Sequence, residues 1–174
     1  MSSFTNPLRI EQLQTDRRMW RIFDGFGYHV GSYPSKEIIR VKHGFVTDLQ
    51  SIPGWSWSII GHPLDDYAQS GAGHDYLYRY PADGVDEPRT RKRCDQIYLE
   101  MNKVLGCPWW KRTLKYTAVR IGGSSGWTNY RIYDDFVSGY PNYVICQRHK
   151  VTMERVNKAI KLVSELNTKQ GEPV

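Results

Sequence analysis

The sequence is poor in cysteine and has no long hydrophobic run. Its three cysteines, Cys94, Cys107 and Cys146, include no close pair, and their odd number argues against a disulfide framework. We therefore expect buried or free thiols in a protein of a reducing compartment. No apolar run approaches the roughly 20 residues that a transmembrane helix needs. The N-terminal segment also lacks the apolar centre of a signal peptide, so we expect no secretion signal there.

The sequence also lacks the spacings of common metal and phosphate sites. His62 and His74 with Asp65 or Asp66 match no zinc pattern, which disfavours a zinc centre. The segment Gly122–Gly126 does not lie between a clear strand and a helix, so we do not interpret it as a phosphate-binding loop. No repeat or low-complexity segment is present.

The composition is basic and aromatic without a nucleic-acid recognition motif. The net charge of +6 suits an anionic partner such as nucleic acid, a membrane surface or an acidic protein. The densest basic cluster, Arg89–Arg93, is expected at a helix start and favours a solvated face over a phosphate site. Four of the six tryptophans have two interpretations. They form an aromatic patch that faces lipid or another protein, or they belong to the hydrophobic core, and a core role is favoured for at least two of them. These four are Trp55, Trp57, Trp109 and Trp110.

The order of the predicted elements, strands followed by helices, indicates a single α+β domain over residues 1–174. We expect a small N-terminal antiparallel sheet packed on an antiparallel helix pair, and an amphipathic C-terminal helix. The predicted segments are an arm (1–16), strands (17–50), a helical core (51–122), an irregular part (123–148), a helix (149–168) and a tail (169–174).

The helical core has recognisable start and stop signals. Pro63 fits a first helical turn, and a helix is predicted over about residues 65–80, ending before Pro81. A second helix is predicted over about 88–105, with Gly106 as its C-terminal cap residue. A third is predicted from Pro108 to the glycines at 122–123. The short connection between the first two helices predicts that they are antiparallel.

The first of these helices carries His74 and Tyr78 on one face, because residues four apart are neighbours on a helix. Its small residues, among them Gly71 and Gly73, permit close approach of the second helix at a cost in helix propensity. That approach would bring Asp95 to the His74 ring, where a carboxylate fixes the tautomer and stabilises the imidazolium. The other ring nitrogen would then accept a proton from water as a general base.

Structural interpretations of the same residues remain open. Asp75 with Arg79, and Arg91 with Asp95, are pairs four residues apart and are compatible with simple surface salt bridges. A histidine beside a tyrosine is also more often structural than catalytic. The geometry of His74, Asp95 and Asp75 decides between these interpretations.

The succession Pro63-x-Asp65-Asp66, His74-Asp75-x-x-Tyr78 and Asp95-x-x-Tyr98 resembles the two active-site helices of the secretory phospholipases that cleave the sn-2 ester. The resemblance covers roughly residues 55–105. It implies that His74 activates water, that Asp95, Tyr78 and Tyr98 orient the His74 ring, and that Asp75 binds calcium. It also implies a calcium loop near residues 54–58, where this chain has tryptophans in place of most of the glycines.

A second resemblance covers residues 44–127. The elements Thr47-Asp48-x-x-Ser51-Ile52-Pro53, His74-Asp75-Tyr76-Leu77-Tyr78, Arg91-x-x-x-Asp95 and Val119-Arg120-x-Gly122 are similar to an uncharacterised family of tailed phages and prophages. It implies phage origin without an established activity. Thr47, Asp48 and Ser51 are interpreted either as a side-chain-capped turn or as a second polar wall of the site that contacts substrate or replaces a metal ligand.

Three functions are consistent with these residues. The first is a phage hydrolase of ester or acyl bonds of the host envelope, with calcium as its possible cofactor. The second is a catalytically silent tail- or capsid-associated protein, whose partners are other virion proteins. The third is a cytoplasmic ligand-binding or host-interfering protein that uses the same pocket. A lipid or membrane surface is a possible partner of the first.

Overall fold

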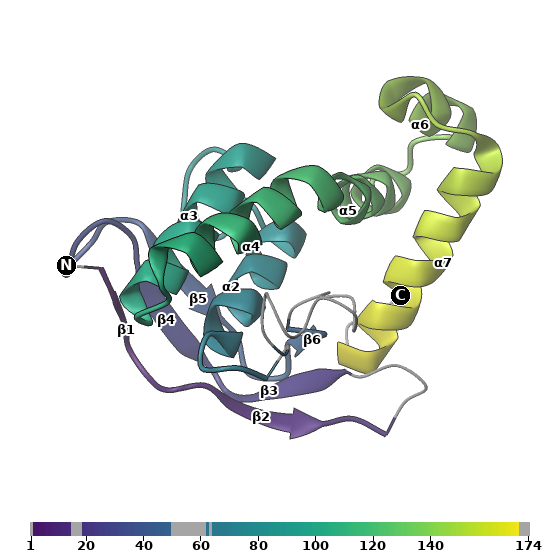
Figure 1. Cartoon of the computed structure of the whole chain (residues 1–174). Helices are drawn as coiled ribbons and strands as arrows, with labels where there is room; N and C mark the ends of the chain where they lie inside the picture. The colour runs from purple at the N-terminus through teal and green to yellow at the C-terminus, as the bar shows by residue number, and fades with distance from the viewer. Residues whose placement is uncertain (1, 15–18, 50–61, 63, 171–174) are drawn as a thin grey trace. The chain divides into compact units, whose positions relative to one another are not determined.

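The computed structural model describes residues 2–14, 19–49, 62 and 64–170 (Figure 1). Two small antiparallel sheets and six helices are present in these ranges, which confirms the predicted α+β class. The sequence predicted one domain over residues 1–174, whereas the contacts group the chain into two compact units, Met1–Ile121 and Gly122–Val174. No helix in the described ranges is long and apolar enough to cross a membrane.

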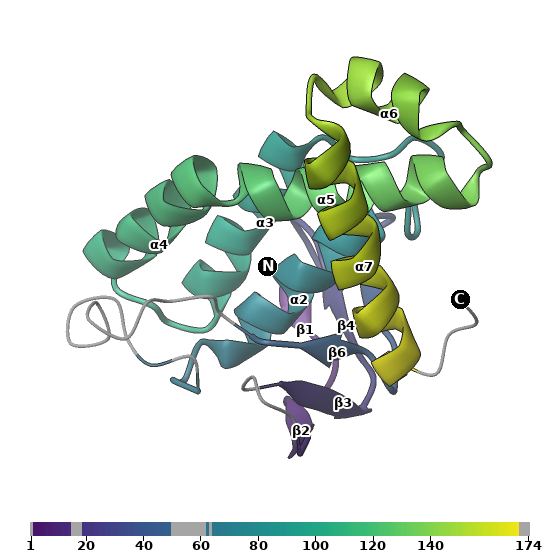
Figure 2. The same ribbon diagram turned by 90° about the vertical axis from the view of Figure 1, so that its right-hand side faces the viewer.

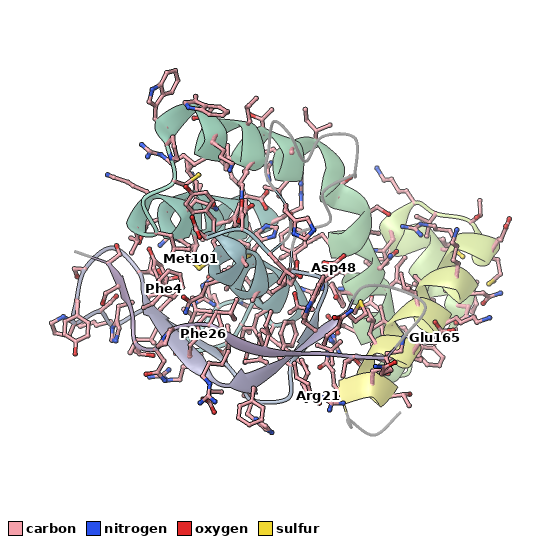
Figure 3. The ribbon with its side chains drawn as sticks, turned by 60° about the horizontal axis from the view of Figure 1, so that its bottom comes forward. Phe4, Arg21, Phe26, Asp48, Met101 and Glu165 are labelled. Atoms are coloured by element: carbon pink, nitrogen blue, oxygen red, sulfur yellow. The ribbon has the colours of Figure 1, made fainter. Side chains whose placement is uncertain are left out.

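Each sheet of the first unit has three antiparallel strands, and each takes one strand from the N-terminal residues. The first has the order β1 (Ser3–Phe4), β4 (Phe26–His29), β5 (Ile38–Val41), and the second β2 (Arg9–Gln12), β3 (Trp20–Asp24), β6 (Val46–Thr47). The predicted arm at residues 1–16 is therefore wrong for β1 and β2. The ring of Phe4 lies 5.9 Å from that of Phe26, so this apolar contact helps to hold β1 on β4 (Figure 3).

The strands of the middle segment alternate as half-buried strands do. In β3, Trp20 and Ile22 are buried while Phe23 is exposed, and in β5 Ile39 and Val41 are buried on either side of exposed Arg40. The buried side chains form the core between the sheets and helix α2.

The predicted antiparallel helix pair is present as α2 (Ala68–Arg79) and α3 (Arg91–Val104), which pack on each other. The Thr90 hydroxyl caps α3 by accepting the Arg93 N–H at 3.2 Å. Gly106 follows α3 with a φ of 79°, the left-handed conformation that the sequence predicts there. A third helix, α4 (Trp109–Gly122), completes the unit.

Close approach of α2 and α3 occurs at Gly73. A Cβ atom at this position would lie 2.8 Å from the sulfur of Met101, a fully buried residue of α3. The small side of α2 therefore has the purpose that the sequence predicted, since a side chain at position 73 would have to displace the end of Met101.

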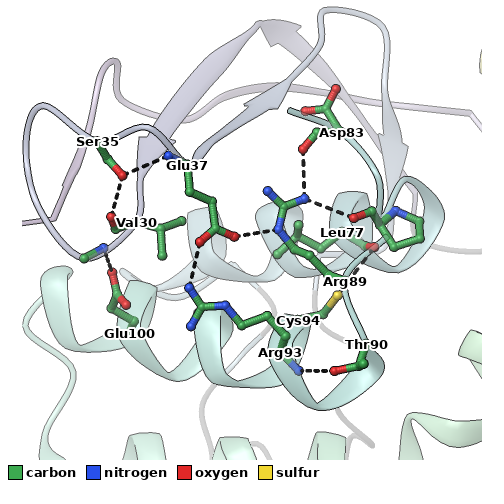
Figure 4. A network of polar contacts seen from close by, with 12 residues as sticks. Val30, Ser35, Glu37, Leu77, Asp83, Arg89, Thr90, Arg93, Cys94 and Glu100 are labelled. Carbon is green, nitrogen blue, oxygen red and sulfur yellow. Dashed lines mark hydrogen bonds and ion pairs between the residues drawn. The ribbon is translucent and has the colours of Figure 1, made fainter. Parts of the chain in front are cut away.

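The basic cluster at the start of α3 is not the solvated face that the sequence favoured. Figure 4 shows that Glu37 accepts hydrogen bonds from Arg89 and Arg93, both at 2.7 Å. Arg89 also donates to the carbonyl groups of Pro81 (3.1 Å) and Asp83 (2.8 Å). The Arg89 side chain is only 3% exposed. Its contacts connect Glu37, the residue before β5, with the loop after α2 and the start of α3 in one largely buried network.

We expect Arg89→Ala to lower the free energy of unfolding by about 3–5 kcal/mol, because it removes one partner of a largely buried ion pair and takes the guanidinium donor from the Asp83 carbonyl group, whereas the Pro81 carbonyl group keeps the backbone N–H of residue 89. Urea denaturation measures this loss. Arg93→Ala is the matched control, since Arg93 binds the same Glu37 from a side chain that is 43% exposed, and we expect it to cost less than about 1 kcal/mol. Equal losses for the two variants would contradict the assignment.

The second unit consists of α5 (Ser124–Val137), α6 (Asn142–His149) and α7 (Met153–Gln170), and α7 crosses α5 (Figure 2). The irregular structure predicted for residues 123–148 is therefore wrong. Packing overrides the loop-like composition, because Ile132 and Ile145 join Val156 and Ala159 in one buried cluster. The predicted C-terminal helix is confirmed as α7, and it extends through Gln170 into the segment predicted as a tail.

Candidate functional site

The His74 ring and the Asp95 carboxylate meet between α2 and α3. His74 Nε2 lies 2.8 Å from Asp95 Oδ1, His74 is 6% exposed, and Asp95 is fully buried. The sequence left open that Asp95 forms only a surface salt bridge with Arg91. The burial of Asp95 and its contact with His74 exclude that alternative. The pair is the one predicted from the small side of α2.

Two tyrosines complete the surroundings of this pair. The Tyr78 hydroxyl donates to the same Asp95 Oδ1 at 2.7 Å, and the Tyr78 ring lies 4.2 Å from the His74 ring. The ring of Tyr98 lies 4.8 Å from the His74 ring. His74 is thus held between two aromatic rings, one of which shares its acceptor. Burial and the neighbouring carboxylate raise the pKa of Tyr78, so this hydroxyl stays protonated and remains a donor.

Arg120 on α4 is the residue of the site to which the sequence assigned no role. Its guanidinium donates to Asp95 Oδ2, and the Arg91 guanidinium lies 3.8 Å from the same oxygen. Arg91 also donates to the carbonyl groups of Val119 (3.3 Å) and Arg120 (3.1 Å). The elements Arg91-x-x-x-Asp95 and Val119-Arg120 are part of the phage-family resemblance, and that was the one signal for this contact.

The donors around Asp95 decide its charge. Burial alone would raise its pKa, but hydrogen bonds from His74, Tyr78 and Arg120 hold the pKa below the ordinary value for an aspartate. An ionised Asp95 accepts and cannot donate, so the hydrogen at the His74 contact belongs to Nε2. In neutral imidazole the other nitrogen, Nδ1, is then the acceptor that a general base requires.

Asp75, the next residue on α2, belongs to a second polar group. Its Oδ2 accepts a hydrogen bond from the Thr47 hydroxyl, and its carboxyl group shares a hydrogen bond with that of Asp48. The Thr47 oxygen in turn accepts the Leu49 N–H at 2.8 Å. The end of β6 thus both forms the predicted side-chain-capped turn and brings Asp48 to Asp75. Ser51, the third residue predicted for this wall, lies outside the described residues.

The carboxyl group of Asp48 makes ionisation of the partly buried Asp75 more costly. Burial and the nearby Asp48 raise the pKa of Asp75 well above the ordinary value, although the Thr47 hydrogen bond opposes this. Asp75 therefore keeps its proton at a pH where an exposed aspartate is ionised, and Asp48 is the acceptor of the hydrogen bond between them.

This arrangement makes stability depend on pH. Since the pKa of Asp75 is higher in the folded protein than in the unfolded chain, its contribution to stability is full below about pH 4 and is lost as the pH rises through the raised value. We expect Asp75→Asn to reduce the fall in melting temperature between about pH 5 and pH 8. Asp86→Asn, on an exposed loop residue, is the control and should follow the wild-type curve. Parallel curves for Asp75→Asn and the wild type would contradict the prediction.

The residues present have the chemistry of a calcium site in part. Carboxylate and hydroxyl oxygens are the ligands that calcium prefers, and Asp75, Asp48 and Thr47 supply them at one place. No group of three or more histidine, cysteine or acidic residues with metal-site geometry occurs in the described ranges. The loop near residues 54–58, to which the phospholipase resemblance assigns further carbonyl ligands, lies outside them.

The fold and the site define an α+β protein with a buried His–Asp pair between two antiparallel helices, braced by an arginine from a third. The chain belongs to the family described as "Protein of unknown function (DUF1353)", whose model matches residues 20–119, more than half of the chain. The match includes His74, Asp75 and Asp95. No curated protein and no solved structure matches the chain.

Proposed function

We propose that this is a bacteriophage protein that hydrolyses ester or acyl bonds of host-envelope lipids with a phospholipase-like His–Asp site. One observation carries the proposal. His74 donates from Nε2 to a buried, ionised Asp95 that also accepts from Tyr78, which leaves Nδ1 as the ring's acceptor. A buried Asp–His pair of this kind is suited to taking a proton from water as the water attacks a carbonyl carbon.

Five residues of the site have a defined part in this mechanism. His74 Nδ1 accepts the proton of the attacking water and later returns it to the leaving alcohol. Asp95 stabilises the imidazolium formed in between, and Tyr78 holds Asp95 in its orientation. Asp75 and Asp48 are the residues that would hold calcium, which when bound supplies positive charge for the carbonyl oxygen of the substrate.

The test is hydrolysis of phospholipid vesicles by the purified protein. We expect release of fatty acid from vesicles that contain anionic phospholipid, measured with and without added calcium. Product analysis with lipids labelled separately at the two ester positions identifies the bond that is cleaved. No release from anionic or zwitterionic vesicles under either condition would overturn the proposal.

One observation favours a second candidate, a catalytically silent virion protein that keeps the fold. Arg120 neutralises the carboxylate that a general-base dyad uses to stabilise its imidazolium, and Asp95 has a complete structural role as the acceptor that joins α2, α3 and α4. Mass spectrometry of purified phage particles tests this candidate, because a structural protein must be present in the particle in fixed proportion to the other components.

A further inference from the structure

Helix α4 has the reverse of the usual amphipathic arrangement. A surface helix normally buries its apolar side chains and exposes its charged ones. In α4 the charged Lys115 is 2% exposed, whereas apolar residues spaced three or four apart face outward. We call this set the α4 outer face, and it consists of Trp110, Leu114, Ala118 and Ile121, with the exposed Trp109 beside it at the start of the helix.

The basic side chains of α4 are turned inward by buried or half-buried acceptors. The Lys115 ammonium lies 2.9 Å from Asp65 Oδ2, and the Lys111 ammonium lies 3.7 Å from the same oxygen. Arg120 donates to Asp95, and Arg112 donates to the Cys107 carbonyl group at 3.0 Å. These contacts fix the rotation of α4 about its axis. The basic side of the helix faces the rest of the first unit, and the apolar side is therefore left exposed.

The exposed side chains are large and have few polar groups among them. Trp109 is 70% exposed, Trp110 46%, Leu114 43% and Ile121 78%. Two exposed threonines, Thr113 and Thr117, lie on the same side of the helix, and the Thr113 hydroxyl donates to the Trp109 carbonyl group at 2.7 Å. Several large exposed apolar side chains on one side of a helix mark a contact with a partner or a lipid surface.

The charge around the α4 outer face selects among its possible partners. No acidic residue occurs between Glu100 and Asp134, a segment that contains the exposed Lys103 and, near the start of α4, Arg112. A second copy of the chain paired through the same face would place these like charges together, since a two-fold interface brings identical surfaces into contact. An anionic surface that accepts apolar side chains fits both the charge and the tryptophans.

We propose that the α4 outer face binds an anionic phospholipid bilayer, with α4 lying in the plane of the membrane interface. Tryptophan side chains are favoured at the level of the lipid headgroups, leucine and isoleucine reach the acyl region, and lysines beside them attract anionic lipid. The inference deepens the proposed function and rests on it for its choice of lipid as partner. Through Arg120 and Asp95 the docked helix is linked directly to the site that would act on that lipid.

Flotation of the full chain with vesicles tests this surface. The vesicles contain ether-linked phosphatidylcholine with or without ether-linked phosphatidylglycerol, because ether lipids have no ester bond to cleave and binding is then measured apart from hydrolysis. We expect the wild type to float with the anionic vesicles. Trp110→Ser combined with Leu114→Ser should lower the bound fraction by about tenfold, and Lys103→Glu should also weaken binding about tenfold.

Tyr143→Ser is the matched control, because Tyr143 is 63% exposed in the second unit and should leave binding unchanged. Failure of the wild type to bind anionic vesicles, or wild-type binding by the Trp110 and Leu114 variant, overturns the inference. The inference is also overturned if the wild type forms a dimer in analytical ultracentrifugation and does not bind vesicles, and the Trp110 and Leu114 variant loses that dimer. Binding without hydrolysis of ester-linked lipid would refute the proposed hydrolase and leave the lipid surface in place.

Discussion

His74→Ala is expected to reduce the rate of vesicle hydrolysis by about 10²–10⁴-fold, the range in which a positioned general base contributes. In the proposed mechanism Nδ1 accepts the proton of water, and alanine has no acceptor at that place. Fatty-acid release from ester-linked anionic vesicles measures the loss. Circular dichroism and thermal unfolding show whether the variant keeps its fold.

The chain supplies a matched control for this experiment. In the second unit His149 Nε2 lies 2.7 Å from Asp135 Oδ2, so it has the same type of partner at the same distance. His149→Ala removes a comparable pair from a place where no chemistry is proposed, and it should retain wild-type activity. A His74→Ala variant that is folded and fully active would show that the His–Asp pair is structural.

Asp95→Ala is expected to lower the free energy of unfolding by about 3–5 kcal/mol. The carboxylate is completely buried and accepts from His74, Tyr78 and Arg120, so its removal leaves these donors without their acceptor. Asp24→Ala is the control. It removes one partner of the exposed Arg9–Asp24 ion pair and should cost less than about 1 kcal/mol.

A double variant separates the charge pair from the other contacts of Asp95. If the loss of the carboxylate that pairs with Arg120 is the main cost in Asp95→Ala, then Arg120→Met in the same chain should recover part of that cost, a non-additive result. Strict additivity would contradict the pairing. The pH adds an independent measurement, because the stability from Asp95 is present above the ordinary carboxyl pKa of about 4 and is lost as the pH falls through its lower value in the folded protein.

The parts of the fold that the sequence predicted are those with local signals. Gly106 marks the end of α3, and the small residues of α2 indicate a helix packed close to it, from which the contact between His74 and Asp95 follows. The approach of Asp48 to Asp75 was one of two interpretations of the turn after β6, and it had no local signal that favoured it.

The parts that the sequence did not predict depend on contacts between distant segments. Strand β1 is two residues long and has no alternation to detect, and its pairing of Phe4 with Tyr28 lies far along the chain. Helix α5 contains glycine, serine and asparagine, which favour loops, and it is stabilised by packing of Ile132 that no local pattern encodes. Arg120 lies on α4 and Asp95 on α3, so residue spacing within one helix cannot predict their contact.

The shared acceptor Asp95 also governs how the first unit opens. Its two oxygens are satisfied only when α2, α3 and α4 are all docked, since each helix contributes one of the groups that meet there. Release of α4 alone would leave a charged carboxylate short of its strongest donor in an apolar interior, so partial opening is costly. We therefore expect these three helices to exchange their amide hydrogens with one common opening free energy, as a single cooperative unit.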